Sequence, residues 1–96
     1  MSDEITVKFL PLMTERLGRD EAGRITARYY GCSKGPLCAH VAVSELQAYE
    51  YAARGSRSVE EMSEEMARHH AEAMFGQYEE DRAQAERMRT YMESRQ

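Results

Sequence analysis

The amino-acid sequence predicts an α+β fold, in which a small antiparallel sheet of about three strands packs against a medium helix and a long C-terminal acidic amphipathic helix. Two observations predict this fold. Apolar and polar residues alternate within the first 43 residues, as in half-buried strands, whereas apolar residues from Ser44 onward recur at helical spacing. The chain has 96 residues, which suffices for a single domain with a mainly β head (1–43) and a helical part (44–96).

Three runs in the head have the alternation of half-buried strands, and these are residues 5–10, 24–30 and 38–43. Pro11 ends the first run, and residues 12–17 are expected to form a short helix that stops at Gly18. The stretch 31–36 contains glycine and proline and is expected to be a loop. Three strands with one apolar face are about the minimum for a stable sheet.

Two capping boxes mark the beginnings of the helices. Ser44 with Gln47 opens a helix that stops at Gly55, and Ser58 with Glu61 opens a second helix that extends to about Glu93. Leu46, Tyr49 and Tyr51 are the expected packing residues of the first helix. The second helix is interrupted only by Gly76 and would be roughly 50 Å long if continuous. It therefore either folds back near Gly76 or projects as an arm that meets a partner.

Helical spacing predicts one apolar stripe along the long helix. Its members are Val59, Met62, Met66, His70, Ala73, Met74, Met88, Tyr91 and Met92, with His69 at its edge. Met62 and Met66 are expected in the core, because methionine is usually buried. Met88, Tyr91 and Met92 are expected to form an interface, because the stripe thins toward the C-terminus. The partner there is either a second copy, giving a homodimer, or a target protein.

The acidity of the chain is confined to its C-terminal part. Residues 1–58 carry a net charge of +1 and residues 59–96 a net charge of −5. Because neutralisation of phosphates supplies most nucleic-acid affinity, direct DNA or RNA binding is disfavoured. A local basic patch of Arg16, Arg19, Arg24 and Arg28 is the exception, and a solvated surface is the favoured interpretation of it.

Cys32, Cys38 and His40 are the densest group of metal-binding side chains. Thiolate and imidazole suit Zn²⁺, which takes four such ligands tetrahedrally, and His70 or His69 would be the fourth ligand. The alternative is that the cysteines are core residues and the histidines bind backbone or glutamates. A second cluster, made of Glu61, Glu65, His69 and Glu72, shares one side of the long helix, and a solvated face is favoured there.

The sequence favours a protein without catalytic activity. Cys32 or Cys38 beside His40 or His70 would suit a nucleophile, but no oxyanion-forming elbow, phosphate loop or dinucleotide fingerprint accompanies them. No apolar run is long enough for a membrane span, and the acidic start lacks the basic head of a signal peptide. A cytoplasmic protein is therefore expected, in which a disulfide between the two cysteines is not expected.

The function predicted first is a non-enzymatic interaction module, an inhibitor or adaptor that docks on a protein partner through Glu60, Glu61, Glu64 and Glu65, together with Met88, Tyr91 and Met92. An acidic helix suits a basic, nucleic-acid-binding groove on the partner, and phage-encoded anti-CRISPR and other anti-defence proteins have a similar size and charge. The alternative is a zinc-dependent dimeric DNA-binding regulator, in which the arginine patch meets DNA. A thiol or metal enzyme centred on Cys32, Cys38 and His40 ranks third.

Overall fold

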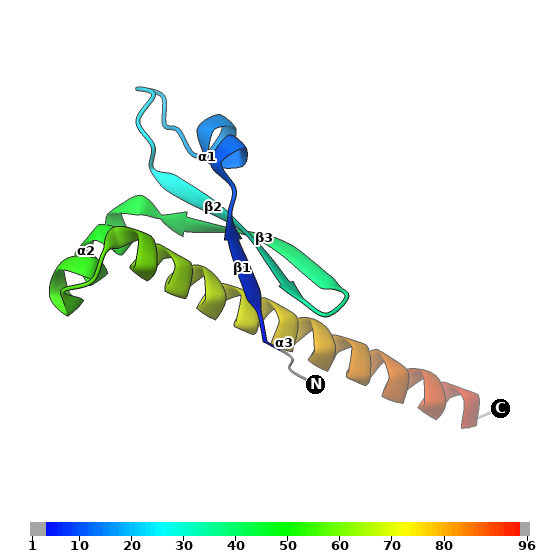
Figure 1. The fold of residues 1–96 in the computed structure, drawn as a ribbon. Helices are drawn as coiled ribbons and strands as arrows, with labels where there is room; N and C mark the ends of the chain where they lie inside the picture. Colours follow the sequence, from blue (N-terminus) through cyan, green and yellow to red (C-terminus); the bar gives the residue numbers. More distant parts are fainter. Residues whose placement is uncertain (1–3, 95–96) are drawn as a thin grey trace.

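The computed structural model describes residues 4–94 and has the predicted α+β architecture. Its elements in chain order are β1 (Thr6–Phe9), α1 (Pro11–Leu17), β2 (Ala27–Lys34), β3 (Leu37–Ser44), α2 (Glu45–Gly55) and α3 (Val59–Ser94). The three strands form one sheet that lies across α3, while α1 sits beyond the end of the sheet that is distant from the arm (Figure 1). In the part of the chain so described, no helix is both long and apolar enough to cross a membrane.

The sheet is antiparallel with the order β1-β2-β3, so β1 and β3 are its edges. Residues 31–34 belong to β2 and pair with β3 from Leu37 onward, so the loop predicted for residues 31–36 is wrong. Only Gly35 and Pro36 form the turn. Gly35 has a φ of +59°, and proline holds a negative φ, which together match a two-residue type II′ hairpin.

The inner face of the sheet packs on a line of mostly small residues along α3. The strands and the residue before β1 contribute Ile5, Tyr30, Cys32, Val41 and Val43 to this core. The helix contributes Ser63, Ala67, Ala71 and Phe75, each four residues after the last and therefore on one side. Small side chains let the helix approach the sheet closely. Ser63 is fully buried.

The predicted stripe on the long helix is therefore partly wrong. His70, Ala73 and Met74 are exposed, whereas Val59, Met62 and Met66 are half-buried beside the core. The predicted stripe follows the large apolar side chains, whereas the sheet contacts Ser63, Ala67 and Ala71, which lie one position further along the helix. α2 shows the same effect, because Ala48 and Ala52 are buried while Leu46, Tyr49 and Tyr51 are exposed.

Both predicted helix caps are present. The Ser44 hydroxyl accepts a hydrogen bond from the Gln47 N–H at 3.3 Å, and the Ser58 hydroxyl accepts one from the Glu61 N–H at 3.1 Å. α2 ends at Gly55, and Ser56 then takes a left-handed conformation with a φ of 54°. This reverses the chain so that α2 packs against α3.

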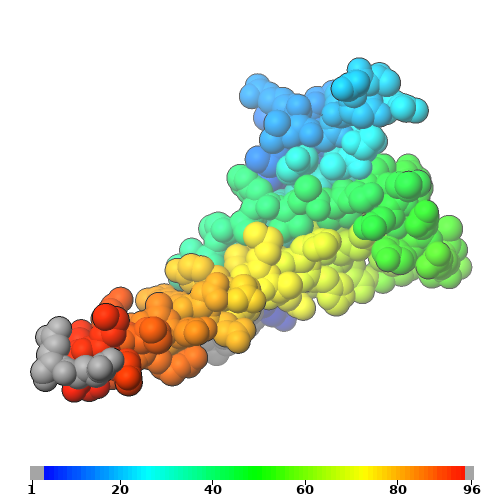
Figure 2. All heavy atoms as spheres, turned by 180° about the vertical axis from the view of Figure 1, so that it is seen from behind, coloured from blue at the N-terminus to red at the C-terminus, as the bar shows by residue number. Residues whose placement is uncertain are grey.

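α3 is one unbroken helix of 36 residues and does not fold back at Gly76. Phe75 is its last buried residue, and residues 76–94, the arm, are exposed throughout. The arm makes the molecule 59 Å long and only 22 Å thick (Figure 2). The radius of gyration is 17.6 Å, against about 12.5 Å for a compact domain of this length.

Candidate functional site

The structure does not bring the four predicted zinc ligands together. Cys32 is buried against α3, with its sulfur 3.9 Å from the carbonyl oxygen of Ala67, whereas Cys38 is exposed on the outer face of the sheet. The register explains this, because Cys38 pairs with Ser33 and so points away from the side of Cys32. His70 and His69 are exposed on α3. Within residues 4–94, no three His, Cys, Asp or Glu side chains form a group that could hold a metal ion.

His40 shares the outer face of the sheet with Cys38. It borders an apolar hollow of about 490 Å³ that lies between this face and the start of α1, with Leu10, Leu12 and Met13 on its walls. The second cluster has the features of the solvated face favoured for it: Glu65 pairs with Arg57, while His69 and Glu72 are 3.9 Å apart and exposed. His40 therefore lies on the sheet surface and His69 lies on an exposed face of α3.

The two thiols are expected to differ sharply in reactivity. Exposed Cys38 should be alkylated at once in the native protein, whereas Cys32 should react only on unfolding, which mass spectrometry after a short iodoacetamide pulse would measure.

Burial also raises the pKa of Cys32, so the folded state disfavours its thiolate. Folding stability should therefore decline as pH rises above the ordinary thiol pKa of about 8.5. A Cys32→Ala variant should lose this pH-dependent decline in stability. Prompt alkylation of both cysteines in the native protein would contradict the burial of Cys32.

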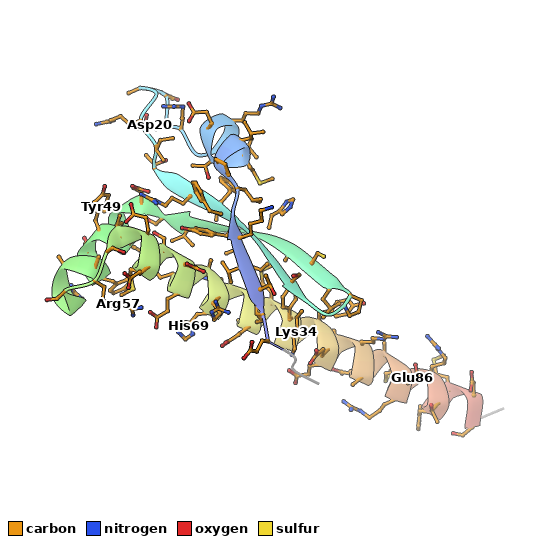
Figure 3. All side chains as sticks on the ribbon, viewed as in Figure 1. Asp20, Lys34, Tyr49, Arg57, His69 and Glu86 are labelled. Atoms are coloured by element: carbon orange, nitrogen blue, oxygen red, sulfur yellow. The ribbon has the colours of Figure 1, made fainter. Side chains whose placement is uncertain are left out.

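The arginine patch is largely neutralised by carboxylates of the same region. Arg19 pairs with Glu15, and Arg24 pairs with Asp20 at 3.2 Å. Arg28 binds both oxygens of Glu45, with distances of 2.6 and 3.2 Å, and these hydrogen bonds raise the pKa of the guanidinium. Of the four arginines, only Arg16 has no ion pair among the described residues. Asp20, the partner of Arg24, lies in the turn after α1 (Figure 3).

The four predicted docking glutamates occupy the first two turns of α3 and form what we call the acidic cluster: Glu60, Glu61, Glu64 and Glu65. Arg57, just before the helix, pairs with Glu65 and lies 4.0 Å from Glu61. Glu60 and Glu64 are exposed and make no ion pair with any described residue. Figure 3 shows Arg57 and His69 near the two ends of this stretch, and Glu86 far along the arm.

A hollow of about 370 Å³ lies between the acidic cluster and the edge strand β1. Val7 and Phe9 of β1 form its apolar wall, and Glu60 and Glu64 line the α3 side. Phe9 and Tyr30 are in ring contact, with centroids 5.5 Å apart. Burial raises the pKa of Tyr30, which keeps this phenol neutral. Arg28 also lines the hollow, but Glu45 already engages its guanidinium.

Sequence reasoning identified the glutamates of this hollow but not Val7, Phe9 or Tyr30. The alternation of Ile5, Val7 and Phe9 could have placed these three side chains on one face of β1. Nothing local indicates that this face meets the start of α3, because the two segments are about 50 residues apart in the chain.

The predicted interface residues of the arm are all exposed, with 55% of Met88, 58% of Tyr91 and 63% of Met92 accessible. They lie on the part of the arm that extends beyond the sheet (Figure 2).

Comparison of the chain with protein-family models, with curated proteins and with solved structures finds no match.

Proposed function

We propose that this protein is a non-enzymatic interaction module, an inhibitor or adaptor that docks the acidic cluster of α3 on a basic surface of a protein partner. The observation that carries the proposal is the pair of exposed carboxylates, Glu60 and Glu64, which have no cationic partner among the described residues and border a hollow with apolar walls. Surface glutamates are commonplace, but two of them beside an apolar hollow offer a receptor for a cationic side chain.

Lysine and arginine have the matching chemistry. Their aliphatic stems can cover Val7 and Phe9 while the charged heads reach Glu60 and Glu64. Arg57 engages the other half of the cluster, so the incoming cation is directed to the side that faces β1. A planar guanidinium would have the added advantage of stacking on the Phe9 ring.

The negative electrostatic potential of α3 favours the same kind of partner, one with a basic surface. The part of α3 from Val59 to Asp81 carries eight acidic side chains and a single arginine, Arg68. Opposed potentials accelerate encounter and fix orientation. A groove that binds nucleic acid is a natural basic target, and occupying it would inhibit the partner, as phage anti-CRISPR and anti-defence inhibitors of nucleic-acid machinery do. A cytoplasmic location suits the two free cysteines.

A matched pair of charge reversals tests the proposal. A fluorescent peptide of alternating arginine and alanine is titrated into the full chain at low salt, and anisotropy reports binding. Glu60→Lys with Glu64→Lys should weaken binding at least about tenfold, because both carboxylates at the hollow are replaced. Glu80→Lys with Glu93→Lys changes the net charge equally on the arm and should weaken it far less.

Equal losses for the two pairs would show that only net charge matters and would overturn the docking site. Absence of peptide binding would do the same. Retention of a DNA fragment at low salt, in place of the peptide, would instead favour a DNA-binding regulator.

A further inference from the structure

The side of the arm that carries most of its apolar side chains is exposed, and these side chains are regularly spaced. Met74, Tyr78, Asp81, Ala85, Met88 and Met92 follow each other at intervals of four and three residues. This is the seven-residue repeat of a coiled-coil seam, in which positions a and d face a second helix. Five of the six positions are apolar, and all six are exposed in the single chain.

Charge along the same helix changes sign within this seam. The ten residues 72–81 carry four acidic side chains and no basic one, whereas residues 82–96 carry four arginines and two glutamates. Two arms that run parallel would set acidic stretch against acidic stretch. Two arms that run antiparallel set each acidic stretch against the partner's basic one, which attracts.

We infer that the arm pairs with the arm of a second copy of this chain, in an antiparallel two-helix coiled coil. Helical spacing fixes one register in which every seam position faces another. The facing pairs in this register are Met74 with Met92, Tyr78 with Met88, and Asp81 with Ala85, each occurring twice by symmetry.

The register also explains the one polar seam residue. Asp81 faces a small alanine, and the Arg82 of the second copy lies within one helical turn of it, which is within reach of a guanidinium. Phe75 and Glu79 point toward the sheet and its hairpin, so they do not belong to the seam: Phe75 is buried in the core, and Glu79 lies 3.5 Å from Lys34. Pairing therefore leaves the head and its acidic cluster free.

Two alanines of the arm offer a matched test. Ala85 is in the seam, whereas Ala83 lies on the opposite side of the helix, and both are exposed. Light scattering coupled to size exclusion should give twice the chain mass of 11.1 kDa for the parent at high concentration. Ala85→Glu should raise the dimer dissociation constant at least about 100-fold by placing a carboxylate in the seam, and Ala83→Glu should leave it unchanged.

Orientation is tested by cross-linking in a Cys38→Ser background. With an added thiol oxidant to accept the two electrons, Met74→Cys mixed with Met92→Cys should form a mixed disulfide rapidly, whereas each variant alone should cross-link slowly. A parent chain that stays monomeric at every concentration would overturn the inference. So would a dimer that survives Ala85→Glu, or faster cross-linking of each variant with itself. Circular dichroism of both glutamate variants confirms that the head is folded.

Discussion

Replacement of Phe75 by alanine is expected to lower the free energy of unfolding by about 3 to 5 kcal/mol. Phe75 is the last residue of α3 to enter the core and is only 4% exposed. Its ring closes the core beyond Ala71, where the helix leaves the sheet. A domain of this size is stable by roughly 5 to 15 kcal/mol, so the loss would bring the protein close to unfolding.

Urea denaturation followed by circular dichroism measures this change. Tyr78→Ala is the matched control at a chain concentration low enough to keep the arm unpaired, because Tyr78 is an aromatic residue on the same helix, three residues further on and 50% exposed. It should cost less than about 1 kcal/mol. If the two variants unfold at the same urea concentration, Phe75 does not anchor the helix.

Enlargement of Ala67 to leucine is expected to destabilise the protein by about 3 kcal/mol. Ala67 has no exposed surface, and its carbonyl oxygen lies beside the sulfur of Cys32, so the sheet leaves no room for a larger side chain. Added methylene groups in such a core force the backbone apart or drive side chains out of their rotamers. The urea midpoint should fall with little change in slope.

Ala73→Leu tests the specificity of this effect on the same helix. Ala73 is exposed, and leucine has nearly the helix propensity of alanine, so the change should be within about 0.5 kcal/mol. An apolar stripe drawn from hydrophobicity alone places Ala73 toward the sheet. A large loss at Ala73 and a small one at Ala67 would therefore show that α3 is rotated relative to the arrangement described above.

Much of the fold follows from local signals in the sequence. Alternation over residues 5–10 predicts β1, Pro11 and Gly18 bound the short helix, and the serine caps at Ser44 and Ser58 mark where both long helices begin. The exposed glutamates of the acidic cluster were predicted as well, because helical spacing separates them from the apolar residues. These features depend on a few neighbouring residues, so a single chain displays them.

The predicted zinc site depends on tertiary structure that local sequence patterns do not determine. Cys32 and Cys38 are close in sequence, and a loop between them would allow both to turn toward one ion. The tight turn at Gly35 and Pro36 instead keeps both cysteines in paired strands. Strand pleating then sends Cys32 to the core and Cys38 to the outer face. This turn is shorter than the predicted loop, and it separates the two cysteines that were predicted as zinc ligands.

The sequence alone determined the number and order of the strands and helices and where the charge resides, because periodicity, caps and turn residues act over a few positions. Only the tertiary structure decided which side of α3 meets the sheet. Hydrophobicity ranks methionine above alanine, yet close approach of helix and sheet selects the smallest side chains, Ser63, Ala67 and Ala71. That rotation also places Glu60 and Glu64 beside Val7 and Phe9 and leaves the seam of the arm facing solvent.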